Sequence, residues 1–277
     1  MASVHPAEAS LPTLSKLGNP TLEEGLDTVA IAKGWFASFS KAAEAADVAA
    51  VLGLLIDSEF TSGAFGDGPT IENPNPDALS VYWRDLLALT WDLRTFEGAP
   101  SIAKVLEDRL ASTKLSNLSL EPSDFAVERW SPELAWITLV FTFDTEVGHG
   151  RGLARIVPMA SQGNVVWKGH TIFTNLEGLK GYPELRGPHR NPKPNHGKWE
   201  AERQKELAFE DRDPAVLIIG GGHSGLNTAA RLRMLGVSHL VVEQNPRIGD
   251  NWRTRYEALS LHDPVCECFT NSRFIPV

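Results

Sequence analysis

The sequence predicts an α+β domain followed by an incomplete α/β unit. Three observations predict this fold class. Apolar residues recur at helical spacing from Asp27 to Ile56, and a two-residue alternation replaces that spacing between Ala135 and Asn175. A buried strand, a glycine-rich turn, a helix and a second strand follow from Val216 to Glu243. Helices followed by an antiparallel meander are typical of an α+β domain whose curved sheet closes over the helices.

Composition and charge exclude two classes of partner. Of the 277 residues, 42% are apolar, and the formal net charge of −9 without a basic block offers nucleic acid no electrostatic footprint. The longest apolar run, Val48 to Ile56, is too short to cross a bilayer. We therefore expect a cytoplasmic protein that binds neither nucleic acid nor membrane.

Cys266 and Cys268 are too close together for a relaxed disulfide, and we interpret them as free thiols rather than metal ligands.

The first domain is expected at residues 27–183, after a flexible leader at residues 1–26. Helical spacing predicts two helices between residues 27 and 56 and another helix within residues 78–98, and a short amphipathic helix follows at residues 101–112. The residues at helical spacing are, in these three stretches, Val29, Ala32, Trp35, Phe36 and Phe39, then Val48, Val51, Leu52 and Leu55, and finally Trp83, Leu86, Leu87 and Trp91.

Three strands complete this domain, at residues 135–145, 152–159 and 164–175. Gly148, Gly150 and Gly152 lie between the first two strands and predict a hairpin turn. This order of elements resembles the SnoaL-like or nuclear-transport-factor-like cone, a small α+β fold. The resemblance implies a domain used for dimerisation, for binding small apolar molecules, or for simple enzyme chemistry.

Residues 184–212 are polar, charged and proline-containing, and we expect a linker there with a helix from Trp199 to Leu207. The second unit is expected at residues 213–277. Gly220, Gly222 and Gly225 follow a buried strand at G-x-G-x-x-G spacing, which permits a tight turn, a close backbone approach to a pyrophosphate, and close packing of helix on strand. The helix that begins near Ser224 directs its amide groups towards that pyrophosphate.

Glu243 lies at the end of the next strand, where a carboxylate accepts hydrogen bonds from an adenosine ribose. The combination of strand, glycine turn, helix, strand and acid predicts a Rossmann-type dinucleotide site. A purely structural β-α-β unit is the alternative.

The residues after Glu243 resemble flavin-containing monooxygenases, particularly the YUCCA-type and fungal N,N-dimethylaniline-monooxygenase-like members. The matching positions are Gly249, Asp250, Trp252, Arg255, Tyr256, Leu261 and His262. The resemblance favours FAD over NAD. It implies that the pyrophosphate lies over Gly220 to Gly225, the ribose on Glu243, and the flavin near residues 249–262. It also implies NADPH as the reductant of the flavin and a small-molecule substrate that receives one oxygen atom. The alternative is that Trp252 and Tyr256 are packing aromatics.

The family continues for hundreds of residues beyond such a motif, including a second glycine motif for NADPH. The sequence printed here shows none of this, so we expect an incomplete FAD-binding domain in a truncated product with impaired or no activity. Two other functions stay open. The chain could act as a non-catalytic small-molecule-binding or dimerisation protein through its first domain, forming a homodimer. That domain could also be a small isomerase or hydratase, for which Asp144 and His170 are the pair to test.

Overall fold

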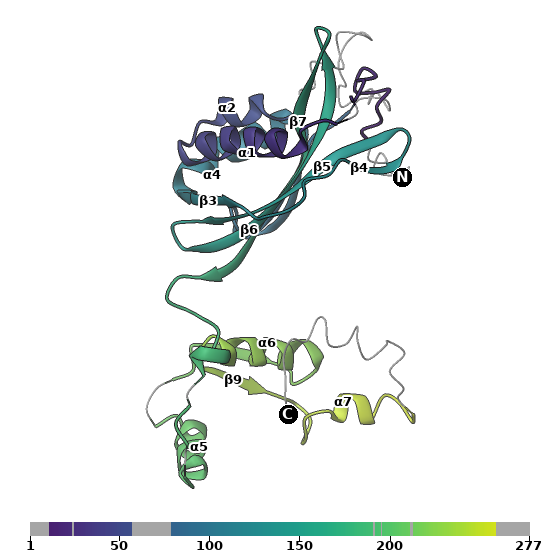
Figure 1. The fold of residues 1–277 in the computed structure, drawn as a ribbon. Coiled ribbons are helices and arrows are strands. Elements are labelled where there is room, and N and C mark those ends of the chain that lie inside the picture. Colours follow the sequence, from purple (N-terminus) through teal and green to yellow (C-terminus); the bar gives the residue numbers. More distant parts are fainter. Residues whose placement is uncertain are drawn as a thin grey trace. The chain divides into compact units, whose positions relative to one another are not determined.

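Apolar residues at helical spacing place three helices on one face of the N-terminal sheet (Figure 1). The computed structural model describes residues 11–23, 25–56, 79–190, 192–194, 196–210 and 213–258. The helices are α1 (Thr28–Glu44), α2 (Val48–Gly53) and α4 (Ala99–Thr113). Asp27 and Asp47 cap the first two, because their carboxylates accept hydrogen bonds from the backbone N–H groups of Ala30 at 2.9 Å and Ala50 at 3.0 Å. The structure confirms the two helices predicted between residues 27 and 56 and the one predicted at residues 101–112.

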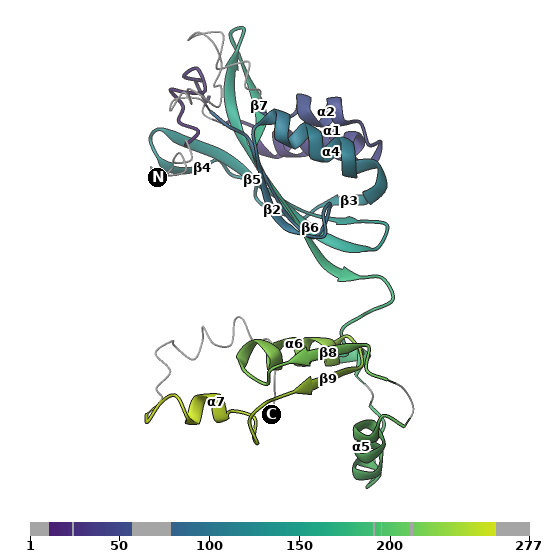
Figure 2. The same cartoon turned by 180° about the vertical axis from the view of Figure 1, so that it is seen from behind.

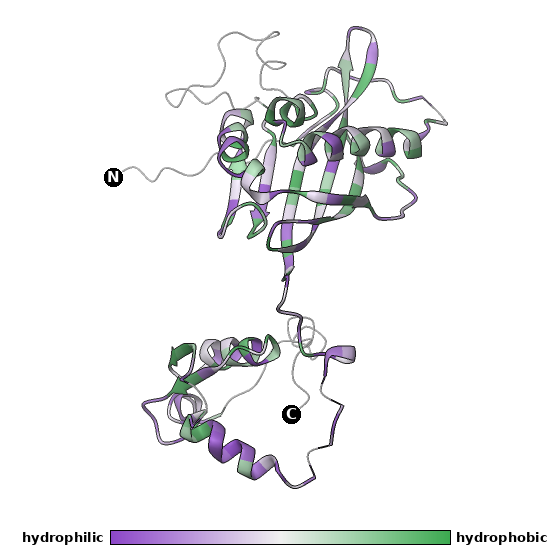
Figure 3. Cartoon of the chain, turned by 90° about the vertical axis from the view of Figure 1, so that its left-hand side faces the viewer, coloured by the Kyte–Doolittle hydropathy of each residue, from purple (hydrophilic) through white to green (hydrophobic). Residues whose placement is uncertain are grey.

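Seven strands form the sheet beneath the helices. The strands are β1 (Tyr82–Leu86), β2 (Leu93–Glu97), β3 (Ser116–Leu120), β4 (Glu128–Ser131), β5 (Leu134–Asp144), β6 (Gly148–Ser161) and β7 (Asn164–Leu179). Their order is β2-β1-β7-β6-β5-β3, with β4 paired to β5, and the β1–β7 pair is parallel. The predicted strands are confirmed as the long strands β5, β6 and β7, and hydrophobic and hydrophilic residues alternate along the sheet (Figure 3).

The helix predicted within residues 78–98 is wrong, because this segment forms the β1–β2 hairpin. Trp83 and Asp85 are both buried on the helix-facing side of β1, at 1% and 0% exposure, whereas Arg84 between them is exposed. Trp91, placed on a helical stripe by its spacing, lies in the turn and is 68% exposed. Parallel pairing of β1 with β7 therefore overrode the local helical pattern.

Gly148, Gly150 and Gly152 are not a turn but residues of β6, which corrects a second expectation. A Cβ at Gly152 would lie 2.3 Å from the ring of Phe141, and one at Gly150 would lie 2.4 Å from the ring of Phe143. These pairs face each other across β5 and β6. Glycine is needed here because the two phenyl rings lie over the backbone of the neighbouring strand.

Aromatic side chains fill the space between helices and sheet. The Phe39 ring lies 5.2 Å from Trp35, 6.2 Å from Trp83 and 5.7 Å from Phe141, measured between ring centroids. Leu17 is fully buried in the same core, and its carbonyl accepts a hydrogen bond from the Ala160 N–H at 2.9 Å. Residues 11–23 therefore pack against the cone, which differs from the flexible leader expected there.

The second unit begins after Lys180. It contains a short 3₁₀ turn (Gly187–His189), α5 (Trp199–Ala208), β8 (Val216–Ile219), α6 (His223–Met234), β9 (His239–Val242) and α7 (Asp250–Arg253). β8 and β9 are parallel neighbours, as predicted (Figure 2). Leu217 and Ile219 of β8 are 58% and 85% exposed, whereas Ile218 between them is 9% exposed. Across the described ranges of both units, no helix is long and apolar enough to span a membrane.

Candidate functional site

The turn between β8 and α6 has two positions where the backbone itself requires glycine. Gly220 has a φ of +101°, in the region that side chains disfavour, and its N–H donates to the Val242 carbonyl at 2.7 Å. A Cβ at Gly225 would lie 1.9 Å from the Gly220 carbonyl oxygen, so α6 packs directly on the turn. These are the tight turn and the close helix packing that the sequence motif predicts.

Gly222 differs from both, because none of the described residues around it demands glycine there. Its φ is −80°, and a Cβ would meet only Asn251 Nδ2, at 3.5 Å. Gly222 is the N-cap of α6, and no described side chain caps this helix. The amide groups of the first turn therefore remain available to an anion. A glycine with room around it at a helix N-terminus is what close approach of a phosphate requires.

Glu243 lies beside this turn because parallel strands end at the same edge of a sheet. Its Oε2 accepts a hydrogen bond from the Gly221 N–H at 2.6 Å. Its Oε1 accepts two from Asn245, from the backbone N–H at 3.0 Å and from Nδ2 at 2.7 Å. The N–H groups of Asn245 and Gly221 lower the pKa of the Glu243 carboxyl, because they stabilise its charged form.

The next residues fold back on the turn. A Cβ at Gly221 would lie 2.5 Å from Ile248 Cδ1, so the Ile248 side chain lies directly on the glycine backbone. Gly249 has a φ of +86° and begins α7. Asp250 is 8% exposed, and its carboxylate accepts hydrogen bonds from the Arg247 N–H at 3.1 Å and from Arg253 Nη1 at 2.8 Å. The Arg253 and Arg247 side chains lower the pKa of Asp250.

The structure thus brings Gly220, Gly222, Gly225 and Glu243 together and places Gly249 and Asp250 in the adjoining turn. Trp252 stacks on Tyr256 at a centroid distance of 5.9 Å and is 38% exposed. Leu261 and His262, like Cys266 and Cys268, lie outside the described residues. Sequence reasoning did not single out Gly221, Asn245 or Ile248. An asparagine two residues after the acid was the available signal, since asparagine bonds local backbone groups.

In the N-terminal domain, Asp144 and His170 do not form a site, which corrects that expectation. Asp144 pairs with His149, and His149 pairs with Gly178, which is eight residues along β7 from His170. At about 3.3 Å per strand residue, the two side chains are separated by about 25 Å. Asp144 instead accepts a hydrogen bond from Asn117 Nδ2 at 2.8 Å.

His170 lies at a bulge, since Arg155 pairs with Thr171 while the next residue of β6, Ile156, pairs with Gly169. Its Nδ1 lies 3.0 Å from the Thr171 hydroxyl, and its buried Nε2 has no hydrogen-bond partner among the described residues. Burial, and secondarily the charge of Arg155, lower the pKa of His170 to about 4. The imidazole is therefore neutral at physiological pH.

Asp85 is a buried carboxylate that sequence reasoning did not single out. It accepts hydrogen bonds from the backbone N–H of Leu89 at 3.1 Å and of Thr90 at 2.9 Å, and from the Thr174 hydroxyl at 2.6 Å. Trp83 Nε1 donates to the same hydroxyl at 3.0 Å. With its oxygens engaged in this way, Asp85 holds the β1–β2 turn in place.

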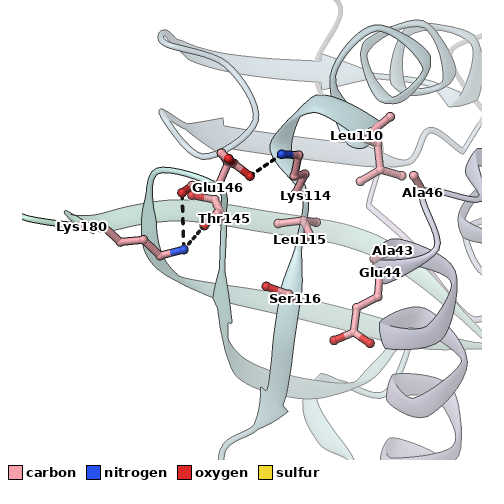
Figure 4. A pocket seen from close by; sticks show the side chains of 11 residues that line it. Ala43, Glu44, Ala46, Leu110, Lys114, Leu115, Ser116, Thr145, Glu146 and Lys180 are labelled. Carbon is pink, nitrogen blue, oxygen red and sulfur yellow. Dashed lines mark hydrogen bonds and ion pairs between the residues drawn. The ribbon is translucent and has the colours of Figure 1, made fainter.

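A pocket of about 350 Å³ lies where α1 and α4 end (Figure 4). Its two lysines already have partners. Lys114 Nζ pairs with Glu146 Oε2 at 2.8 Å, and Lys180 Nζ donates to the Thr145 carbonyl at 2.5 Å. The Lys114 side chain lowers the pKa of Glu146. Both lysines are therefore already engaged by protein groups at the rim of this pocket.

Comparisons with known proteins match the two parts separately. A family model described as an NAD(P)-binding Rossmann-like domain matches residues 218–269. No curated protein gives a significant match. The chain is similar to a ketosteroid isomerase-like protein from Erwinia carotovora atroseptica, at 11% identity over 55% of this chain and 98% of that one, with a TM-score of 0.35.

Two further solved structures have similar values. A cystatin-like fold protein from Burkholderia xenovorans matches at 14% identity over 55% of this chain and 93% of that one, with a TM-score of 0.33. An NTF2-like protein with a cystatin-like fold from Novosphingobium aromaticivorans matches at 9% identity over 56% of this chain and 84% of that one, with a TM-score of 0.31. The chain has an α+β domain with helices on one face of a seven-stranded sheet, followed by a parallel β-α-β segment that the Rossmann-like family model matches.

Proposed function

We propose that residues 213–258 bind the ADP half of a dinucleotide, and that the chain belongs to the lineage of FAD-dependent, NADPH-using monooxygenases. The observation that carries the first part is the geometry at Gly222. This glycine has open space, an ordinary φ and an uncapped helix behind it, next to the carboxylate of Glu243. A purely structural turn would not require glycine at this position.

Each residue of the turn has a distinct part in binding. Gly220 reverses the chain, and Gly225 brings α6 close enough to direct its first amide groups at a pyrophosphate. Glu243 is ionised and offers its oxygens to ribose hydroxyls. These residues fit the adenosine diphosphate portion that FAD and NADPH share.

FAD is the preferred ligand because of residues 248–253. Gly249, Asp250 and Trp252 stand where the resemblance to flavin-containing monooxygenases expects them, and Ile248 covers Gly221 beside the turn that Asp250 holds. Bound FAD would supply the oxygen-transfer chemistry to a small-molecule substrate, whereas the residues described here bind and orient it.

The decisive experiment compares Gly222→Ala with the unchanged protein. Because a Cβ fits at Gly222 in the free chain, this variant should keep its circular dichroism and melting temperature. A bound pyrophosphate would meet the added methyl group, at a cost of about 1–3 kcal/mol, which is about a 5- to 150-fold loss of affinity. Isothermal titration calorimetry with FAD, ADP and NADPH measures the effect.

Gly163→Ala is a control glycine substitution in the other domain. Gly163 lies in the turn between β6 and β7, where a Cβ meets nothing within 4 Å. It should leave FAD affinity unchanged, although its φ of +80° costs some stability in the cone. Absence of binding of all three nucleotides by the unchanged protein would overturn the proposal. Equal affinity in Gly222→Ala would refute the role of the turn.

We propose self-association of the cone as a second function, because a row of apolar side chains crosses the face of its sheet that the three helices leave uncovered. The row lies between the exposed Arg151 and Arg155 of β6. Val140, Leu153 and Phe173 are cross-strand neighbours on the face opposite the three helices, and each is half-buried. Trp136 lies on the same face, and Trp130, which is 75% exposed, stacks on it at 6.5 Å. A second copy of this chain is the occupant that we propose.

Sedimentation velocity over a range of concentrations tests this proposal. A homodimer should dissociate in Leu153→Lys, which places a charge at the centre of the apolar row. Ser112→Lys adds the same charge on the exposed surface of α4, on the helical side, and should leave the dimer intact. A monomeric unchanged protein at every concentration would overturn the second proposal.

A further inference from the structure

The Glu243 carboxylate is held in one orientation by neutral donors only. Gly221 bonds one oxygen at 2.6 Å, and the backbone and side chain of Asn245 bond the other at 3.0 and 2.7 Å. The two oxygens are thus fixed by different segments of chain. A carboxylate without these bonds would rotate about its own side-chain torsions.

Asn245 is itself restrained. Pro246 follows it, and a residue before proline is confined to extended backbone conformations. Asn245 directs its backbone N–H and its side-chain Nδ2 at one oxygen of Glu243. Two donors from one residue act together, so that the bonds form without a further loss of chain entropy.

No cation balances the charge of Glu243 within the described part of this unit. The charged or titratable side chains on the segments packed around it are His223 at the start of α6, and Arg247, Asp250 and Arg253 in the following turn. Arg247 and Arg253 form ion pairs with Asp250, at 3.3 and 2.8 Å. The hydrogen bonds from Asn245 and Gly221 therefore account for the lowered pKa of Glu243.

We propose that Asn245 is a positioning residue for ribose recognition, which fixes the Glu243 carboxylate so that it accepts hydrogen bonds from the ribose of a bound adenine dinucleotide. This inference rests on the proposed dinucleotide binding. Asn245 acts through Glu243 and need not touch the ligand. The free carboxylate is already in its binding orientation, and binding costs correspondingly less ordering.

The test uses Asn245→Ala, which removes the Nδ2 donor and keeps the backbone N–H. ADP and 2′-deoxy-ADP are titrated into the full chain by calorimetry. The unchanged protein should prefer ADP, and Asn245→Ala should weaken ADP binding about fivefold while affecting 2′-deoxy-ADP less, because the lost hydrogen bond is worth about 1 kcal/mol. Gln244→Ala, at an exposed neighbour whose backbone N–H is retained, should match the unchanged protein.

A second measurement does not depend on ligand. The pKa of the Glu243 carboxyl, followed by ¹³C NMR in the free protein, should rise in Asn245→Ala and stay unchanged in Gln244→Ala. ADP affinity should correspondingly fall at a higher pH in Asn245→Ala. An unchanged ADP preference and an unchanged Glu243 pKa in Asn245→Ala would overturn the inference while dinucleotide binding stands. Failure of the unchanged protein to bind ADP and FAD would instead overturn the proposed function.

Discussion

Acidification should destabilise the cone through His170. The imidazole is largely buried, its Nε2 has no partner among the described residues, and its folded-state pKa is about 4, against 6.5 for a solvated histidine. Because the folded pKa is depressed, the unfolded chain binds a proton first as the pH falls. The contribution of His170 to the free energy of unfolding is therefore unchanged above about pH 6.5. It falls between pH 6.5 and 4 and is constant below pH 4.

The pKa difference sets the magnitude. At about 1.4 kcal/mol per pH unit, the free energy of unfolding should drop by about 2 kcal/mol at pH 5 and by about 3 kcal/mol below pH 4. His170→Asn removes the titrating ring and keeps a polar side chain. The difference in unfolding free energy between the unchanged protein and this variant isolates His170 from the other acids of the chain.

Urea denaturation followed by tryptophan fluorescence, at half-unit steps from pH 7.5 to 3.5, measures this difference. Trp35 and Trp83 report on the cone core, where they contact Phe39. A difference between the two proteins that stays constant across the whole range would refute the reasoning. A difference that changes only above pH 6 would refute it as well, because it would place the folded pKa above the unfolded one.

Three stability predictions concern the cone, each measured by urea denaturation at pH 7.5. Asp85→Ala leaves buried N–H and hydroxyl groups unpaired and should cost about 2–4 kcal/mol. Asp92→Ala on the same turn, where Asp92 pairs with Arg94 at the surface, should cost much less; equal costs would refute the role of Asp85. Phe39→Ala should cost about 3–5 kcal/mol, and a loss below 1 kcal/mol would contradict the aromatic core. Gly152→Ala should cost about 1–3 kcal/mol, since its Cβ would displace the Phe141 ring, and a stabilised variant would contradict that packing.

Much of the fold followed from local patterns in the sequence. The apolar stripes predict α1 and α2. In the structure Asp27 and Asp47 cap these two helices. The alternation in residues 135–145 predicts β5 because one face of that strand is buried and the other is not. The glycine motif predicts the β8–α6 turn because its conformation depends on residues adjacent in the chain.

The candidate site followed from sequence only in part. The G-x-G-x-x-G spacing identified the three glycines. Glu243 followed because it ends the strand after the helix that these glycines begin. The spacing did not reveal that Asn245 and Gly221 hold the Glu243 carboxylate, or that Ile248 lies on the glycine backbone. Side-chain bonds of this kind depend on how a loop folds back on itself.

Only the tertiary structure decided the remaining features of the cone. The segment containing Trp83 and Asp85 has helical spacing, yet it forms a strand because β7, nearly ninety residues later in the chain, offers it a parallel partner. Asp144 and His170 lie at distant levels of the sheet because strand register, which depends on the whole meander, determines which residues become neighbours. The sequence by itself determined the positions of α1, α2, α4, β5 and the glycine turn between β8 and α6, because these depend on neighbours in the chain. Pairing, register and the contacts of buried polar groups depend on residues far apart in the chain, and they were determined only when the sheet formed.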